Sequence, residues 1–449
     1  MKNILLLYNA TQTYTNTVFE HLNCFATYSK NRFFFMHCDP ACIFSADLRK
    51  FDAVCVHYSI RLPYDQLSQS TVEALSAFEG LKFLFIQDEY DHTYRAWHWI
   101  TRVGFQLVFT VVPELGIERV YPPEKFRNTR FVTNLTGYVP MDGFNDESFE
   151  PPSQRKLMIG YRGRPLPVRY GRLGFEKVGI GKLVNTYCSG KGIACDIAWS
   201  EESRIYGPAW GRFMRSCRAM LGSESGSNVF DCEGSLDAKI DCFRQANPKA
   251  SDYDIYEKVV RPLEIDGLMN QVSPRVFEAI AARTVLVLFE GDYSGVVRPD
   301  EHFIPLKKDG ANLHEVFAKL NDENYIDTMA EQAYRDVIAS GRYSYRSFVK
   351  MVDRELDCSF NNFAHVLDDD HSHVVRVSGN EKVGLYSSVP IRVGFDGAVQ
   401  TDSLGRQWDG TLKLTIPVAR MWAKIPEPAR AGLRPLARRL KRAFLPVDD

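Results

Sequence analysis

The sequence predicts an α/β protein built from two doubly wound, Rossmann-like domains that face each other across a cleft. The chain has 449 residues, which is too long for one ordinary hydrophobic core. Short apolar runs alternate with amphipathic stretches in two consecutive blocks, as in parallel sheets covered on both faces. A polar, proline-rich break near residue 150 separates the two blocks.

The first block, residues 1–145, is expected to form the N-terminal domain, and residues 146–154 are expected to link it to the second block. Its helices are expected at 17–28 and 70–78. Its strands are expected at the buried apolar runs 4–8, 32–36, 53–57, 83–86 and 107–110.

The second block, residues 155–343, repeats the alternation and is expected to form the second domain. Its strands are expected at 156–160, 194–198, 219–222 and 284–289. Its helices are expected at 175–189, 210–217, 275–282, 313–321 and 325–340. Because open α/β sheets bind ligands at the carboxyl ends of their strands, we expect the functional site in the cleft between the domains.

The remaining chain forms a small C-terminal extension in this interpretation. Residues 344–373 are expected to form a crossover helix followed by an acidic, histidine-containing loop, which we interpret as solvated rather than metal-binding. Residues 374–449 are expected to combine short strands with a basic amphipathic segment at 418–445. Basic residues opposite Trp, Phe and Leu suit an anionic membrane surface, and the alternative is a helix docked on the protein body.

Composition narrows the class further. A hydrophobic fraction of 45% and a charged fraction of 25% are those of a soluble globular protein. The formal net charge of -1 gives no global attraction to nucleic acid. The first apolar run is too short for a signal peptide, and no stretch approaches the length of a membrane helix. We therefore expect a cytoplasmic protein, peripheral on the inner face of the membrane if the basic segment binds lipid.

The most informative stretch begins at Ser273 and runs through a predicted helix into the strand at 284–289. Pro274 suits the first position of a helix, and Ser273 suits its N-cap. The helix start attracts phosphate, and Arg275 adds a bidentate phosphate donor. Glu278 lies one turn further, where a carboxylate can accept hydrogen bonds from two adjacent ribose hydroxyls. The alternative for Glu278 is an ordinary cap or ion pair.

This stretch resembles the donor-site motif of two-domain glycosyltransferases of the GT-B fold. In that group a Glu-Ala-Met/Ile-Ala helix precedes a strand, and its Glu holds the nucleotide ribose. The continuation at 290–306 is similar to the spore-maturation-protein type within the bacterial glycosyltransferase family 1/4 group. The resemblance covers residues 155–340 and reaches the first domain only by architecture. It implies a nucleotide-diphosphate sugar as donor, a hydroxyl on a glycan, lipid-linked or protein acceptor, and no metal or other cofactor.

The family carries a second Glu eight positions upstream of Glu278, where this chain has Asn270. We expect the segment from Gly222 onward to replace it, with residues 235–268 as an insertion. Glu224 would face the donor sugar, and its neighbours would approach the phosphates, unless the segment is a plain Gly/Ser turn. These neighbours are Ser225, Gly226, Ser227 and Asn228.

The family also uses a Gly-Arg turn and a later Lys to neutralise the leaving diphosphate. Gly163, Arg164 and Lys177 match this pattern, with Arg162 and Arg169 as competing arginines. The resemblance implies that these cations stabilise the departing diphosphate without a metal. Alternatively, they form ordinary surface ion pairs.

The acceptor half of the site is expected after the strand at 83–86. Asp88 or Glu89 could serve as general base, and Asp91 and His92 could bind acceptor hydroxyls, unless the segment is a plain acidic loop. His57 and Thr11 follow other strands and are expected to line the same acceptor pocket.

The resulting functional expectation is a glycosyltransferase of bacterial surface glycan or glycoconjugate synthesis. Two alternatives stay open: a nucleotide-sugar epimerase of the same fold, and a non-catalytic scaffold with a glycosyltransferase-like fold. Because Asn270 replaces the expected carboxylate, retention or inversion of the sugar configuration does not follow.

Overall fold

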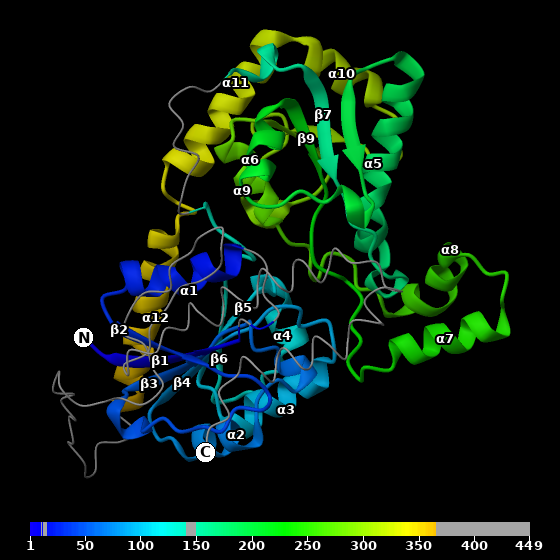
Figure 1. The fold of residues 1–449 in the computed structure, drawn as a ribbon. Coiled ribbons are helices and arrows are strands. Elements are labelled where there is room, and N and C mark those ends of the chain that lie inside the picture. The colour runs from blue at the N-terminus through cyan, green and yellow to red at the C-terminus, as the bar shows by residue number, and fades with distance from the viewer. Residues whose placement is uncertain (10, 12–15, 141–149, 365–449) are drawn as a thin grey trace, which may run out of the picture.

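Two parallel sheets organise the chain (Figure 1). The structure, a computed structural model, describes residues 1–9, 11, 16–140 and 150–364. The predicted acidic loop, the strands after residue 374 and the basic segment 418–445 lie outside the described residues. Alternate residues of β1 enter two different cores, so both faces of the first sheet are covered. The predicted α/β class with two Rossmann-like units is confirmed.

The first sheet has six strands in the order β2-β1-β3-β4-β5-β6, and every pair is parallel. Its strands are β1 (Asn3–Tyr8), β2 (Arg32–His37), β3 (Ala53–Val56), β4 (Leu81–Phe85), β5 (Leu107–Thr110) and β6 (Arg130–Thr133). Its helices are α1 (Asn16–Tyr28), α2 (Gln69–Ala77), α3 (Thr93–Val103) and α4 (Ile117–Val120).

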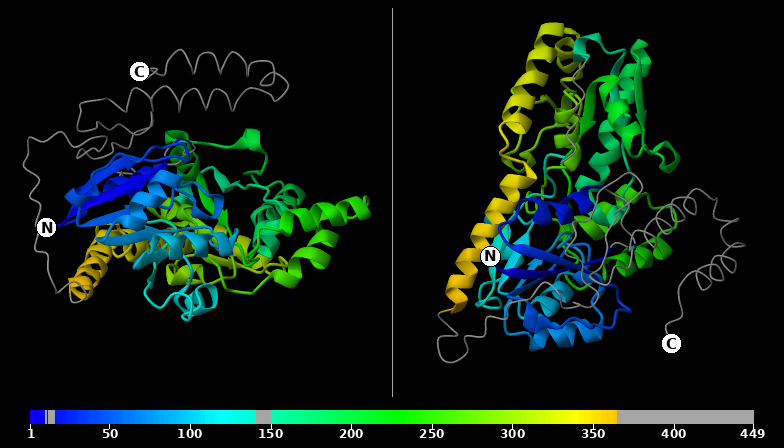
Figure 2. Two further views of the ribbon diagram at one scale, coloured as in Figure 1. Left: turned by 90° about the horizontal axis from the view of Figure 1, so that it is seen from below. Right: turned by 60° about the vertical axis from the view of Figure 1, so that its left-hand side comes forward.

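A helix from the far end of the described chain completes this first domain. After residue 340 the chain returns as α12 (Tyr345–Ala364), which runs along the first sheet (Figure 2). Phe348, Val352 and Leu356 are buried in the same core cluster as Leu6 of β1. The first domain is therefore assembled from two separate parts of the sequence.

The second sheet has five parallel strands in the order β11-β10-β9-β7-β8. Its strands are β7 (Leu157–Arg162), β8 (Cys195–Ala198), β9 (Cys217–Gly222), β10 (Val285–Phe289) and β11 (Ile304–Leu306). The helices around it are α5 (Gly171–Lys191), α6 (Pro208–Arg215), α9 (Pro274–Ala281), α10 (Leu313–Asn321) and α11 (Glu323–Ala333). A π-helical turn at Tyr334–Ala339 extends α11, in agreement with the helix expected at 325–340.

Several elements were not predicted from the sequence, among them β6, β11, α3 and the short helix α4. The short strands β6 and β11 lie at sheet edges and lack the long apolar run of a central strand. Helix α3 is rich in aromatic and β-branched residues, which favour strands. Its helical identity comes from Ala96, Ile100 and Val103, which recur at helical spacing and are buried.

The expected insertion forms α7 (Leu236–Ala246) and α8 (Asp252–Ile255), which project from the body (Figure 1). The residues that flank it dock onto the first domain, because Phe230, Leu268 and Met269 belong to that domain's core cluster. Backbone bonds reinforce the contact, since Asp231 N–H donates to the carbonyl of Tyr90 at 2.9 Å. This segment therefore ties the two domains together.

None of the helices in the described ranges is long and apolar enough to cross a membrane.

Candidate functional site: a cationic pocket in the second domain

The clearest cavity of the second domain has a volume of about 230 Å³. It lies between the sheet and helices α6 and α9, toward the carboxyl ends of β7 and β9. Its lining residues are Tyr161, Arg164, Leu166, Lys177, Trp210, Met214, Met220, Leu221, Gly222, Ser223, Ser225, Ser273, Arg275, Val276, Ala279, Leu286 and Leu288. The pocket is thus found where an open parallel sheet is expected to bind its ligand.

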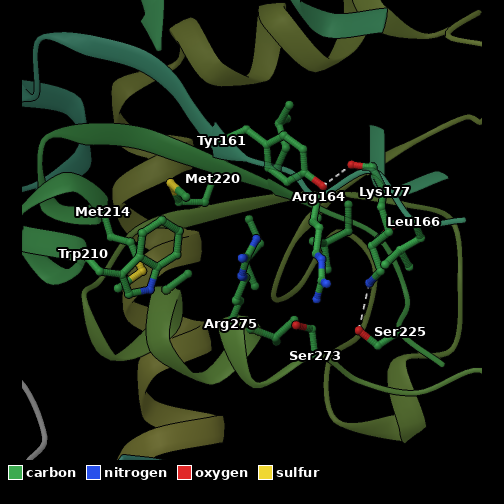
Figure 3. A pocket seen from close by; sticks show the side chains of 17 residues that line it. Tyr161, Arg164, Leu166, Lys177, Trp210, Met214, Met220, Ser225, Ser273 and Arg275 are labelled. Carbon is green, nitrogen blue, oxygen red and sulfur yellow. Dashed lines mark hydrogen bonds between the residues drawn. The ribbon is translucent and has the colours of Figure 1, made fainter. Parts of the chain in front are cut away.

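Three cationic side chains meet in this pocket. Arg164, Lys177 and Arg275 lie next to one another there, with Ser225 and Ser273 at the edge (Figure 3). Lys177 Nζ donates to Ser225 Oγ at 2.8 Å. The lining contains no Asp or Glu, and in the described part of the chain none of the three cations forms an ion pair with a carboxylate. The pocket therefore concentrates positive charge that no direct ion pair within the described residues neutralises.

The pKa of Lys177 reflects its burial first and the neighbouring cation second. Burial and then Arg275 together lower it from 10.5 to about 7, against the raising effect of Glu176 and Glu224. A cation that is buried near another cation gains most from an anionic ligand. The low pKa thus makes Lys177 a candidate for binding an anion.

The start of α9 contributes a further polar feature. Ser273 is the N-cap residue and Pro274 is the first helical residue, as predicted. The Ser273 side chain makes no capping hydrogen bond and lines the pocket instead. The hydroxyl and the helix start can therefore both face an anion.

Glu278 lies one turn along α9, and it contacts the lining residue Trp210 without lining the pocket itself. Trp210 Nε1 donates to Glu278 Oε2 at 2.8 Å. Burial raises the pKa of Glu278, while the Trp210 hydrogen bond and Arg275 lower it. No described residue donates a hydrogen bond to the other oxygen, Oε1. The carboxylate is thus held at one oxygen, and the other oxygen has no donor among the described residues.

The structure separates the competing arginines. Arg162 turns away from the pocket and pairs with Asp196 at 2.8 Å, and it also donates to backbone carbonyls. Arg169 forms an ion pair with Asp91 of the first domain at 2.7 Å. Arg164 is the arginine of this segment that lines the pocket. Gly163 does not line it, and a Cβ there would lie 2.9 Å from the carbonyl of Lys177. Gly163 therefore serves the close approach that positions Lys177.

Glu224 does not face the pocket, which corrects the expectation from the sequence. The residue is 2% exposed, and Oε1 accepts the N–H groups of Asp292 and Tyr293 at 3.1 and 3.0 Å. Its Oε2 accepts from Asn270, whose own carbonyl oxygen accepts from Asn228 at 2.7 Å. An amide has both a donor and an acceptor, so Asn270 can join a carboxylate to a second amide. Glu224 thus fixes the loop after β10.

The neighbours of Glu224 divide in the same way. Ser225 lines the pocket, together with Ser223, which was not predicted. Gly226 adopts φ +91°, and a Cβ there would meet the carbonyl of Met269 at 2.1 Å. Ser227 bonds to the carbonyl of Tyr170, and Asn228 accepts the N–H of Met269. These three residues therefore shape the turn rather than the pocket wall.

In the first domain, Glu89 is fully buried at the end of β4. One oxygen accepts from the Thr110 hydroxyl and from Val111 N–H. Burial raises its pKa to about 7, against the lowering effect of these hydrogen bonds. Glu89 does not reach the surface as a general base would, and it instead ties β4 to β5.

Asp88 and Asp91 differ sharply in exposure. The Asp88 carboxylate is 45% exposed, near Arg61 at 3.3 Å, and it accepts from the Tyr90 hydroxyl. Asp91 is buried and accepts from Tyr64 and Arg169, so it joins the two domains and does not bind an acceptor. Of the acidic residues in this loop, Asp88 is the one that solvent reaches.

The three remaining acceptor candidates also lie away from the pocket lining. His57 is fully buried, and its Nε2 lies 2.9 Å from Nδ1 of His21. His92 is the N-cap residue of α3 and contacts the ring of Tyr64. Thr11 is exposed in the turn after β1 and donates to Asn9. His57 is therefore a core residue, contrary to the expectation, whereas Thr11 stays accessible.

Sequence reasoning missed Trp210 and the apolar floor formed by Met214, Met220 and Leu286. The available signal in the sequence was a tryptophan, Trp210, at the start of the helix predicted at 210–217. Its role depends on contacts with α9, which lies 60 or more residues later and cannot be paired with it by spacing.

A metal site has no support within the described ranges, where no group of three or more His, Cys, Asp or Glu side chains could hold an ion. The Asp368–His373 cluster lies outside those ranges.

Comparison with known proteins identifies only similarities of fold. No family model matches the sequence, and no curated protein matches it. Among solved structures, an α-glucosyltransferase in complex with UDP and a 13-mer DNA has 10% identity and a TM-score of 0.46, covering 81% of this chain and 99% of that chain. Sucrose-phosphate synthase from Thermosynechococcus elongatus has 10% identity and a TM-score of 0.41, covering 81% and 100%. Anabaena Alr3699/HepE in complex with UDP has 9% identity and a TM-score of 0.43, covering 80% and 100%.

Proposed function

We propose that the protein is a glycosyltransferase that moves a sugar from a nucleotide-diphosphate sugar to a hydroxyl acceptor. The observation that carries the proposal is the group of three cations, Arg164, Lys177 and Arg275, in a pocket whose lining has no carboxylate. Such a group fits a ligand with two adjacent negative charges, as a diphosphate has. The apolar floor beside it fits a nucleobase.

The proposed mechanism follows from these positions. The bond between the anomeric carbon and the diphosphate oxygen breaks, and the electron pair leaves with the diphosphate. The three cations and the start of α9 stabilise this negative charge as it develops. The acceptor oxygen forms the new bond to the anomeric carbon and loses its proton to a base.

The nucleoside half of the donor is assigned to α9 and α6. Glu278 accepts hydrogen bonds from the ribose hydroxyls through its available oxygen. The base lies against Met214, Met220 and Leu286. Apolar side chains do not distinguish one nucleobase from another, so the donor screen must include several bases.

The acceptor half of the proposal involves the first domain. Asp88 is proposed as the general base, because it is the carboxylate of its loop that solvent reaches. The acceptor would approach from this domain as the cleft closes. By resemblance to bacterial enzymes, we propose a precursor of surface glycan or glycoconjugate as acceptor, and the segment 418–445 as a contact to anionic membrane.

The test is a calorimetric titration with UDP-, GDP-, ADP- and dTDP-sugars, followed by incubation of the bound donor with and without acceptor. We expect one donor class to bind and no new sugar nucleotide to form without acceptor. A new sugar nucleotide in the absence of acceptor would indicate the epimerase, and binding without any turnover would indicate the scaffold. Absence of binding by all four donors would contradict the proposal.

The proposal also predicts the response to metal removal. Because the three side chains supply the positive charge, we expect turnover in EDTA to stay within about twofold of the untreated rate. The control is the same assay after Mg²⁺ is added back. A loss of turnover that Mg²⁺ restores would show that the cations do not suffice.

A further inference from the structure

Trp210 occupies an unusual position in the pocket wall. It comes from α6, and its indole nitrogen donates to Glu278 of α9, so one hydrogen bond joins the two helices that flank the pocket. The indole N–H is the only polar group of a tryptophan side chain. The contact with Glu278 is thus the one directed bond that this side chain makes.

The orientation of the indole is fixed by a column of cations and rings. The ring of Phe213 stacks on Trp210, with centroids 5.7 Å apart and an interplanar angle of 30°. Arg162 lies 4.3 Å from the Phe213 centroid, and Arg275 lies 5.3 Å from the Trp210 ring. Cation–π contacts at these distances are attractive. The indole therefore contacts both the ring of Phe213 and the guanidinium of Arg275.

Arg162, at one end of this column, is held by several hydrogen bonds. Arg162 donates to the carbonyls of Ser203, Tyr161 and Asp196, and it pairs with the Asp196 carboxylate. Arg275 also donates to the carbonyl of Arg162, which joins the two ends of the column. Arg162, expected from the sequence to bind phosphate, instead anchors the stack that orients Trp210.

Fixing one oxygen of Glu278 matters for what the other can bind. A carboxylate side chain on its own rotates about its terminal bond and presents many orientations. With Oε2 held by Trp210, the carboxylate loses much of this freedom, and Oε1 has no donor among the described residues. Two neighbouring hydroxyls on a five-membered ring can then both donate to one carboxylate, as a preorganised site requires.

We propose that Trp210 is a positioning residue that orients Glu278 toward both hydroxyls of a ribose, and that the pocket thereby selects ribonucleoside over 2′-deoxyribonucleoside diphosphates. The inference rests on the proposed function, because it assumes that a nucleoside diphosphate occupies the pocket. It adds the residue that orients Glu278 and the resulting discrimination against 2′-deoxyribonucleotides.

The test compares affinities for a matched pair of ligands. The ligands are the tightest binder among UDP, GDP and ADP, and its 2′-deoxy counterpart. For the unmodified protein we expect the ribonucleotide to bind about tenfold or more tightly, since one charge-assisted hydrogen bond is lost in the deoxy ligand. In Trp210→Phe we expect this ratio to fall to about threefold or less. Binding of inorganic diphosphate should stay unchanged, because the three cations remain.

The chain offers a matched control. Trp99 of α3 also donates its indole nitrogen to a carboxylate at 2.8 Å, that of Asp65 in the first domain. Trp99→Phe removes the same kind of bond far from the pocket and should leave the affinity ratio unaltered. Glu278→Gln, which keeps the shape of the side chain, should lower the ratio as Trp210→Phe does. The double variant should show no further fall, because the two residues act as one unit.

Each contrary outcome has a distinct meaning. An unchanged ratio in Trp210→Phe, together with a collapsed ratio in Glu278→Gln, would overturn the positioning role. Equal binding of both ligands by the unmodified protein would overturn the selection of ribose while leaving the nucleotide site intact. Absence of binding by any nucleoside diphosphate would instead contradict the proposed function.

Discussion

The pocket of the second domain and the loop after β4 in the first domain occupy equivalent places, beyond the carboxyl ends of parallel strands. Their charges are arranged in opposite ways. In the pocket, Arg164, Lys177 and Arg275 have no carboxylate partner among the described residues. In the loop, both oxygens of the buried Asp91 accept hydrogen bonds from protein donors. Glu89 is buried as well, and Thr110 and Val111 donate to its Oε1, whereas its Oε2 has no hydrogen-bond partner among the described residues. Both places are candidates for a ligand site because of their position in the fold. They differ in their charged groups, because the cations of the pocket have no ion-pair partner in the described part of the chain, whereas the carboxylates of the loop are enclosed by the protein.

The largest expected effect comes from removing the buried ion pairs of Arg169, one of which joins the two domains. Arg169 pairs with Asp91 and Asp231, and their carboxylates are only 3% and 6% exposed. Arg169→Ala leaves two buried carboxylates without their cation, so we expect a loss of about 3 kcal/mol in the free energy of unfolding. Denaturant titration measures it. Arg172→Ala, which removes an exposed ion pair with Asp266, is the control and should cost less than about 1 kcal/mol.

The pocket should respond in binding rather than in stability. Lys177→Met removes one cation and its bond to Ser225, and we expect a loss of about 30-fold in donor affinity, or about 2 kcal/mol. Isothermal calorimetry measures this loss. Lys182→Met, an exposed lysine on the same helix, should leave affinity unaltered. An equal loss in both variants would mean that general charge, and not the pocket, attracts the donor.

The lowered pKa of Lys177 predicts that donor binding depends on pH. Without ligand, Lys177 loses its proton near pH 7, whereas a bound diphosphate should keep it charged. Above pH 7 binding must therefore take up a proton, and affinity should fall by up to about tenfold per pH unit. Calorimetry at pH 8 in buffers of different ionisation enthalpy measures this uptake. Lys177→Met should abolish it, and an uptake that persists in this variant would assign the proton to another group.

The smallest effect concerns Glu89, whose pKa is raised from 4.5 to about 7. Because the folded state binds the proton more tightly, its contribution to stability is fully present below pH 4.5 and is lost as pH rises through about 7. Glu89→Gln removes this charge, so we expect the variant to gain about 1 kcal/mol over the parent between pH 5 and pH 6. Thermal unfolding at the two pH values tests this, and a constant difference would contradict it.

The sequence predicted the two sheets well because their central strands are continuous apolar runs, such as β10. It did not predict β6, whose residues are only partly buried, or α3, whose aromatic residues favour strands. These elements owe their structure to neighbours that are distant in sequence. Local propensity therefore sufficed where burial was complete and failed at the edges.

For the pocket, the sequence identified Arg164, Lys177, Ser225, Ser273 and Arg275, all of which line it. It could not choose between Arg162 and Arg164, because the choice depends on Asp196 in a neighbouring strand. It also assigned Glu224 to the sugar, whereas backbone N–H groups after β10 occupy that carboxylate. Residue type and spacing predicted where charges gather, and three-dimensional partners decided which of them remain available.

Helix α12 has a consequence for how the protein is made. Its residues Tyr345 to Leu356 fill a core whose strands are encoded more than 200 residues earlier. A nascent chain emerging at about 5–20 residues per second would therefore keep part of its first core uncovered for tens of seconds. During synthesis the second domain, whose strands are contiguous in sequence, can finish folding first. The order of maturation on the ribosome would thus be the reverse of the order of translation.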